Sequence, residues 1–458
     1  MNKTAFFAAL LLLASVPAAA GDYARYYETL PLPLSEPQAP VIPETRVSVV
    51  DFGGVGDGVT LNTEAFGKAI AALDKRGGGH LDVPSGIWLT GPIVFKNSID
   101  LHLEKGALLL FSPDKSLFVG EDGKVRPGIS ASKRHDISIT GEGVIDGNGE
   151  WWRAVKRGKV SDVEWGDYHR MGGIDEDEGK LWYPFNLKHF GNIAPSHKEQ
   201  EKLRTHLIRL TDCTRVLISG VTVQNSPKFH IVPQRCSQVA IVGVTVRCPW
   251  NAQNGDGIDL MQSKDVLVAD CLVDVGDDGI CLKAGGGAAA LKDGATERVL
   301  IVGNTVFHAH GGFVIGSEFS GGIADVVVRD NVFSGTDTGL RFKSAPGRGG
   351  KTSRVRINGV IMSDIRDQAI VFETSYANVP VGEKGSVAQT EQFLPEFCDI
   401  EIERVVCRDA RIGVKLQGSP AMIHGITLRH STIFCSETLS EIPEAGMMEM
   451  EDVRLLGY

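Results

Sequence analysis

Three short motifs in the middle of the chain set acidic or imidazole side chains beside glycines. They are Asn-Gly-Asp-Gly at residues 254–257, Gly-Asp-Asp-Gly at 276–279 and His-Gly-Gly at 310–312. Carboxyl groups held close together cannot all ionise easily, so one is expected to keep a proton while the others act as bases. Cleavage of a glycosidic bond needs this division between acid and base. The motifs therefore predict glycoside hydrolysis.

Two cations, Arg341 and Lys343, stand at alternate positions of an apolar run downstream. Because side chains alternate between the two faces of a strand, both cations are expected on one face. Cations beside an acid–base group indicate an anionic substrate. The combined pattern favours an acidic polysaccharide as the molecule that is cleaved.

The acid–base residues share a register relative to apolar marker residues. Asp256 and Asp278 come two positions before their markers, and Asp277 and His310 come three before. The markers are Ile258, Ile280 and Phe313. Strands stacked about 4.8 Å apart in this register would bring the four polar side chains to one end of one sheet.

A ladder of aspartates that only caps turns is the alternative interpretation of these residues. We prefer that alternative for Asp259 or Asp330 taken alone. We do not prefer it for Asp256, Asp277 and Asp278 together, because turn capping does not explain the neighbouring histidine and cations.

The elements that position these residues belong to a repeat of short β-branched segments. Their leading residues lie 23 to 33 positions apart and are Val216, Val239, Val266, Val299, Val326 and Val355. Similar segments begin at Ile137, Ile400 and Ile426. The units have no leucine framework and no helix of their own, and glycines punctuate them. This pattern predicts an all-β solenoid, a parallel β-helix in which each coil adds a strand to several stacked sheets.

The solenoid needs a cap, and residues 62–73 are expected to form a capping helix. One face of this helix is apolar at helical spacing, and Asn62 is a plausible N-cap. The apolar residues are Ala65, Phe66, Ala69, Ile70 and Leu73. Residues 21–45 form an irregular N-terminal arm, and residues 46–458 are expected to form a single β-helix domain. The charged stretch 151–204 interrupts the repeat, either as a functional wall or as a solvated loop.

Charge and the N-terminal sequence bear on location and partners. The formal net charge of −10 argues against nucleic acid and anionic membranes as partners. Lys3, an apolar stretch at 5–16 and three alanines before Gly21 fit a signal peptide over residues 1–20. A membrane anchor is the alternative, but the stretch is too short to span a bilayer. We expect an exported protein, periplasmic or secreted, without a membrane span and monomeric.

Eight cysteines are spread through the chain. Cys213 and Cys236 occupy equivalent places in successive repeats, so they form either a packed pair or a disulfide. Most of the eight are expected to be small buried hydrophobes. Cys-x-x-Cys and His-x-x-x-His spacings are absent, which predicts no zinc site. No cofactor is expected.

In their order along the chain, the motifs resemble those of the polygalacturonases and related pectin hydrolases of glycoside hydrolase family 28. That family carries Asn-x-Asp, Gly-Asp-Asp, Gly-His-Gly and Arg-x-Lys on a right-handed parallel β-helix. The resemblance covers residues 46–430, including Asp-Phe-Gly at 51–53. Gly255 replaces the usual threonine and Ala309 the first glycine of the histidine motif, and the second change can shift the bend that aims His310.

The resemblance implies a role for each site residue. Asp277 matches the general acid, Asp256 and Asp278 match the carboxylates that activate water, and His310 matches the imidazole that supports the acid. The residues implied in substrate binding are Arg341, Lys343, Tyr376 and Asn254. The family inverts the anomeric carbon in one displacement without a metal, which requires acid and base carboxyls about 6.5–9.5 Å apart.

Residues 310–318 resemble the exo-acting bacterial branch of the family, and the insertion at 151–204 is expected to close one end of the cleft. The substrate implied is pectin or an oligogalacturonide. Three alternatives stay open: a hydrolase of the rhamnogalacturonan backbone or of a pectin side chain, a polysaccharide lyase, and a non-catalytic β-helix that binds glycan. The lyase would commonly use calcium-binding acids along the sheet, whereas here the acids cluster with a histidine.

Overall fold

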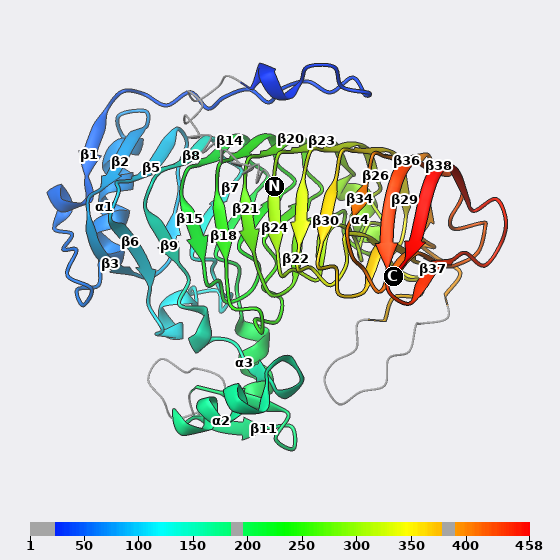
Figure 1. Cartoon of the computed structure of the whole chain (residues 1–458). Coiled ribbons are helices and arrows are strands. Elements are labelled where there is room, and N and C mark those ends of the chain that lie inside the picture. Colours follow the sequence, from blue (N-terminus) through cyan, green and yellow to red (C-terminus); the bar gives the residue numbers. More distant parts are fainter. Residues whose placement is uncertain (1–22, 185–195, 378–389) are drawn as a thin grey trace, which may run out of the picture.

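A computed structural model describes residues 23–184, 196–377 and 390–458 of the chain (Figure 1). The expected signal peptide at 1–20 lies outside the described residues. Most of the described residues wind into stacked coils whose strands pair in parallel along three ladders, here named sheets 1, 2 and 3. Parallel strands joined by crossovers follow the right-handed rule. The fold is the right-handed parallel β-helix that the repeat and the resemblance predicted.

Sheet 1 carries the leading residues of the repeat. Its strands are β1 (Arg46–Ser48), β2 (Gly79–Val83), β5 (Ile99–Leu103), β8 (His135–Gly141), β14 (Thr214–Ser219), β17 (Ser237–Val242), β20 (Lys264–Ala269), β23 (Thr296–Val302), β26 (Ile323–Arg329), β29 (Lys351–Asn358), β32 (Glu396–Phe397), β33 (Ile400–Glu403), β36 (Ile426–Cys435) and β38 (Met448–Gly457). Sheet 2 turns directly out of sheet 1. Its strands are β3 (Gly86–Thr90), β6 (Ala107–Phe111), β9 (Val144–Asp146), β15 (Thr222–Gln224), β18 (Thr245–Arg247), β21 (Leu272–Asp274), β24 (Thr305–Phe307), β27 (Val332–Ser334), β30 (Ile361–Ser363) and β34 (Val406–Cys407), which pairs with the second half of β36.

Sheet 3 has eleven strands and carries the predicted site. They are β4 (Ile93–Val94), β7 (Ile129–Ser132), β13 (Ile208–Thr211), β16 (Ile231–Gln234), β19 (Ile258–Met261), β22 (Asp278–Lys283), β25 (Gly311–Ile315), β28 (Leu340–Lys343), β31 (Gln368–Glu373), β35 (Ile412–Gln417) and β37 (Thr438–Glu441). A short helix, α4 (Gly287–Asp293), interrupts the connection from sheet 3 to sheet 1 after β22.

The register of sheet 1 is the one that the repeat predicted. Val216 pairs with Val239, which pairs with Val266, and the pairing continues through the other leading residues to Ile400 and Ile426. All of these side chains are buried in one core that runs the length of the coils. β-Branched side chains suit this position because they pack well on a pleated surface.

Buried polar and aromatic ladders stiffen the same core. The Asn331 carboxamide accepts hydrogen bonds from the main-chain N–H and the side-chain amide of Asn304, and both asparagines donate to main-chain carbonyls of neighbouring coils. The rings of Phe342 and Phe372 stack with centroids 4.1 Å apart. Each coil is thus held to the next by side chains as well as by the main chain.

The predicted capping helix is α1 (Thr63–Asp74), and all five residues of its predicted apolar face are buried. Asn62 stands at the N-cap position, but its side chain does not cap the helix. It accepts from the N–H of Val55 and donates to the carbonyls of Val55, Thr60 and Leu89. Asn62 therefore ties the preceding loop to sheet 2. The N-cap prediction gave the correct position, but the predicted capping hydrogen bond from the side chain is not formed.

The arm over residues 23–45 lies along the outer face of sheet 1 (Figure 1). It begins with Tyr23 and a short 3₁₀ helix, Ala24–Tyr26, and the side chains of Tyr23 and Tyr26 are buried. They pack against outward-facing apolar residues of successive coils, including Leu217, Leu267 and Leu300. The arm removes from water a stripe that the coils alone would expose.

Residues between β9 and β13 leave the coils and form a separate layer at the side of the solenoid (Figure 1). This stretch contains a small antiparallel sheet and two helices, so it is not an irregular loop. Its elements are β10 (Val155–Lys156), α2 (Asp162–Arg170), β11 (Ile174–Glu176), β12 (Leu181–Tyr183) and α3 (His197–Leu203). A 3₁₀ turn, Arg157–Lys159, joins β10 to α2.

All eight cysteines lie in the described residues and are free thiols. Cys213 and Cys236 are a packed, hydrogen-bonded pair and not a disulfide. None of the described helices is long and apolar enough to cross a membrane.

Candidate active site

The connections from sheet 2 to sheet 3 bring the predicted site residues together. Asp256 comes just before β19, Asp277 and Asp278 lie at the start of β22, and His310 precedes β25. Ile258 pairs with Ile280, which pairs with Phe313, so the register assumed for the markers is confirmed. Successive coils thereby set the four side chains along one edge of sheet 3.

Asp277 is held by three partners. His310 Nδ1 lies 3.1 Å from Asp277 Oδ1, and the N–H of Asn254 donates to Asp277 Oδ2 at 3.0 Å. The N–H of Asp278 donates to Asp277 Oδ1, also at 3.0 Å. Asn254 has a φ of 50°, a left-handed conformation that asparagine adopts more easily than most residues. These contacts fix the carboxyl group that the resemblance assigns as the acid.

The cations Arg341 and Lys343 surround Asp278. Lys343 Nζ lies 2.7 Å from Asp278 Oδ2, and an Arg341 Nη atom lies 3.5 Å from Asp278 Oδ1. Asp278 and Lys343 are both buried. The two cations expected to bind substrate are therefore part of the same charge cluster as a catalytic candidate.

A second buried cluster joins Asp256 to Lys283, which sequence reasoning did not single out. Lys283 Nζ lies 2.6 Å from Asp259 and 3.4 Å from Asp256. Asp259 is thus an ion-pair partner and not a turn cap, which corrects the interpretation preferred for it alone. A signal existed in the sequence: Lys283 ends an apolar strand as Lys343 does, on the outward-facing register of sheet 3.

The three candidate carboxyls differ in their expected protonation. Burial raises the pKa of Asp256 well above its usual range, and the charges of Asp259 and Asp277 raise it further. Burial also acts to raise the pKa of Asp277, but the hydrogen bond and charge of His310, with Lys343 and Lys159, bring it below its ordinary value. For Asp278, burial is outweighed by Lys343, so its pKa is lowered too.

By these directions, Asp256 is the carboxyl of the trio that is protonated most easily in the free protein. The resemblance assigns the acid role to Asp277. Because the three groups interact strongly, the proton belongs to the cluster as a whole. The assignment of roles therefore depends on how a bound substrate changes the balance of charge.

Lys159 brings the insertion into contact with the site. Its ammonium lies 2.8 Å from His310 Nε2 and donates to the carbonyl of Gly276 at 3.1 Å. Arg204, which follows α3, donates to the side-chain oxygen of Asn254 at 2.8 Å. Sequence reasoning missed both residues, because nothing in their spacing relates them to sheet 3.

A cavity of about 520 Å³ opens beside the cluster, and Tyr376 forms part of its lining. The Lys343 ammonium lies 5.0 Å from the centre of the Tyr376 ring, and the Arg341 guanidinium lies 5.4 Å from it. The cavity is lined by polar residues from four successive coils, among them His310, Asp337, Arg341, Glu373, Lys415 and Gln417. A sugar ring bound here would meet cations, carboxylates and an aromatic face together.

Donor atoms of Asp277, Asp278 and His310 lie within 4.8 Å of one another, a spacing compatible with a metal ion. The ammonium of Lys343 already contacts Asp278, and that of Lys159 contacts His310. Two positive charges in direct contact with the donors oppose a further cation. The arrangement fits acid–base chemistry on an anionic sugar better than metal chemistry.

Comparison with known proteins agrees with this geometry. Residues 178–433 match the sequence profile of glycosyl hydrolases family 28. Over 382 residues the chain is 29% identical to the exo-poly-alpha-D-galacturonosidase of Dickeya chrysanthemi, covering 80% of this chain and 62% of that protein. The match thus spans less than two thirds of the Dickeya enzyme.

Two solved structures share the architecture over most of the chain. The exopolygalacturonase of Thermotoga maritima superposes with a TM-score of 0.74 at 28% identity, covering 92% of this chain and 94% of that one. The family 28 exopolygalacturonase of Yersinia enterocolitica gives a TM-score of 0.66 at 25% identity, with coverages of 91% and 79%.

Proposed function

Because the chain belongs to glycosyl hydrolases family 28, we propose that it hydrolyses α-galacturonide linkages of pectin with inversion, acting from one end of the chain. The observation that carries this proposal is the buried cluster of Asp277, Asp278 and Lys343 with Arg341 beside it. It combines an acid–base pair with cations placed for a uronate carboxylate. The exo-acting relatives support the mode of action.

Substrate binding supplies the change in charge that the acid needs. A uronate carboxylate bound by Arg341 and Lys343 adds a negative charge beside Lys343, whose own charge lowers the pKa of Asp277. The pKa of Asp277 then rises, and the proton of the cluster moves to it from Asp256. The free protein and the complex thus differ in which carboxyl is protonated.

Cleavage then moves two protons. Asp277 gives its proton to the glycosidic oxygen as the bond to the anomeric carbon breaks, and a water attacks that carbon from the opposite face. Asp256 and Asp278, both ionised in the complex, orient the water and accept its proton. The His310 imidazole contacts Asp277 through Nδ1 and the Lys159 ammonium through Nε2, and these two contacts fix its orientation.

The insertion supports an exo mode. Lys159 reaches His310, and Arg204 reaches Asn254, so this layer stands directly against the catalytic residues. A wall at that position closes the cleft and admits a chain end. We assign Tyr376 and Asn254 to the site as a sugar contact and as the support of Asp277, respectively. The N-terminal sequence supports export to the periplasm or the exterior, where polymeric pectin is met.

The proposal is tested by comparing acidic and esterified substrates. Wild-type protein should release saturated galacturonate from polygalacturonate, because hydrolysis adds water and a lyase leaves an unsaturated sugar. Arg341→Ala should reduce kcat/KM at least ~10-fold on the acid and much less on the methyl ester, which lacks the charge-assisted contact.

Arg341 is the better residue to change, because Lys343 also pairs with Asp278 at 2.7 Å. Lys415→Ala is a matched control, since Lys415 lines the same cavity but pairs with Glu441 at 2.9 Å. Unsaturated products, or equal losses on both substrates, would contradict the proposal.

A further inference from the structure

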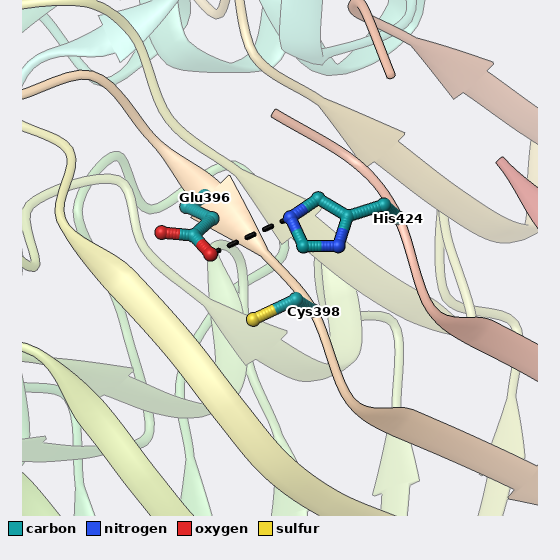
Figure 2. Close-up of side chains that lie close together, drawn as sticks. All are labelled: Glu396, Cys398 and His424. Atoms are coloured by element: carbon teal, nitrogen blue, oxygen red, sulfur yellow. Dashed lines mark ion pairs between the residues drawn. The ribbon is translucent and has the colours of Figure 1, made fainter. Parts of the chain in front are cut away.

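Three side chains with metal-ligand chemistry meet on the outer face of sheet 1, far along the chain from the catalytic motifs. They are Glu396, Cys398 and His424 (Figure 2). Their donor atoms all lie within 4.8 Å of one another. Neither the proposed catalytic cluster nor the cavity beside it includes any of the three.

The coil geometry explains why they meet. Glu396 and Cys398 flank Phe397, whose side chain is fully buried in the core, so period-two alternation turns the two flanking side chains outward. His424 comes from the next coil, where the main-chain N–H of His424 donates to the carbonyl of Phe397 at 3.1 Å. The donors are thus fixed by main-chain pairing.

The donor spacing is close to that of a bound metal. His424 Nε2 lies 3.4 Å from Glu396 Oε1. Two nitrogen or oxygen ligands placed 2.0–2.1 Å from a tetrahedral zinc ion are roughly 3.4 Å apart. Thiolate, imidazole and carboxylate together form a donor set that zinc accepts, with a fourth position left for water.

We propose that Glu396, Cys398 and His424 bind a zinc ion or a similar borderline-soft divalent cation. On binding, the Cys398 thiol loses its proton to solvent as the sulfur–metal bond forms, and His424 coordinates through Nε2. The ion joins two neighbouring coils on the outer face near the C-terminal end. The expectation of no zinc site rested on sequence spacing, which does not detect a donor contributed by another coil.

Lys351 competes with the ion. It pairs in register with Glu396, and its ammonium lies 2.9 Å from Glu396 Oε1. The Lys351 side chain is 59% exposed, so it can swing into solvent when a metal binds. A surface pair of this kind contributes little to stability. Removing Lys351 should therefore tighten metal binding, whereas removing a ligand should weaken it.

The test measures zinc and cobalt binding by the untagged full-length protein. Wild type should bind one zinc ion at this site, and cobalt should give a thiolate charge-transfer absorption. His424→Ala and Cys398→Ser should weaken zinc binding at least ~10-fold, while Lys351→Met should strengthen it several-fold. Zinc should raise the Tm of wild type and not of the ligand variants.

Two controls separate this site from other donors. His430→Ala removes a histidine that pairs with Asp452 on the same sheet, and it should bind zinc like wild type. Binding should also persist in a His310→Ala background, which disables the donor set at the catalytic cluster. Failure of both wild type and Lys351→Met to bind, or binding unchanged in His424→Ala and Cys398→Ser, would overturn the proposal. Neither result bears on pectin hydrolysis.

Discussion

Sheet 3 and the insertion at residues 151–204 both place side chains at the candidate active site, but the positions of those side chains are determined in different ways. In sheet 3, Asp277, His310 and Lys343 come from successive coils, and their positions follow from parallel pairing. In the insertion, Lys159 and Arg204 reach the site from a 3₁₀ turn and from the residue after α3. The coils thus supply the proposed reacting groups, and the insertion supplies contacts to His310 and Asn254 beside them.

The positions of side chains can be predicted from the sequence in the coils but not in the insertion. A repeat imposes a period of two along each strand and a fixed step between coils, so one correct alignment places many side chains at once. The insertion has no such period, and its path to the site depends on packing between residues 50 to 151 positions apart. The effects of substitutions should follow the same division.

The largest effect is expected from Asp277→Asn. An amide cannot protonate the leaving oxygen, so kcat should fall at least ~10²-fold while the melting temperature stays near that of wild type. Asp330→Asn, at an exposed aspartate in a coil turn, is the control and should keep full activity. Activity of Asp277→Asn within tenfold of wild type would remove Asp277 from the acid role.

A large loss of stability is expected from Asp259→Asn, also in the coils. Asp259 is the nearest partner of the buried Lys283 ammonium, at 2.6 Å. Removing one member of a buried ion pair costs about 3–5 kcal/mol. Denaturant unfolding measures the change, and an exposed pair such as Arg354 with Asp325 provides the comparison. A loss below about 1 kcal/mol for Asp259→Asn would show that Asp256 alone satisfies Lys283.

A smaller effect is expected from the insertion, through Lys159→Ala. Loss of the contact with His310 Nε2 should lower kcat about tenfold. The effect is smaller than for Asp277→Asn because Lys159 positions a catalytic group and does not itself react. The charge of Lys159 also helps to lower the pKa of Asp277. Its removal should raise that pKa, so activity should persist to higher pH. The control is Lys180→Ala, which changes an exposed lysine of the same layer and should alter neither kcat nor the pH profile. An unchanged pH profile in Lys159→Ala would show that Lys159 does not influence the pKa of Asp277.

The smallest effect is expected from Asp256→Asn on stability. Its pKa is raised in the folded protein, mainly by burial. The folded state therefore binds this proton more tightly than the unfolded state, and stability falls as pH rises above the unfolded pKa of about 3.9. The asparagine of the variant does not titrate, so the Tm of the variant should fall less than that of wild type between acid and neutral pH. Parallel Tm–pH curves for the two proteins would contradict the raised pKa.

Much of the fold and the site could be predicted from the sequence. The valines of sheet 1 and the markers Ile258, Ile280 and Phe313 were in the register that the structure shows. The cations on β28 followed from alternation alone. These predictions succeeded because parallel pairing in a fixed register determines where each residue of the local sequence pattern lies in the sheet.

Other features could not be predicted, for physical reasons that differ. The Asn62 side chain bonds a loop that folds back on it, and a capping pattern does not reveal this alternative. Asp259 was interpreted as a turn cap, because its ion-pair partner Lys283 lies on the next coil. Lys159 reaches His310 across 151 positions of sequence. Each of these contacts depends on tertiary packing that does not follow a periodic pattern in the sequence.

The central claim, that a closed cleft makes this family 28 enzyme act on chain ends, is tested most directly by following the viscosity of polygalacturonate together with the reducing ends formed. We expect the viscosity to fall slowly while reducing ends accumulate, with galacturonate or one galacturonate-terminated fragment of fixed size as the early product. A rapid fall in viscosity with mixed oligomers at early times would contradict it and make the insertion a surface layer without a role in the mode of cleavage.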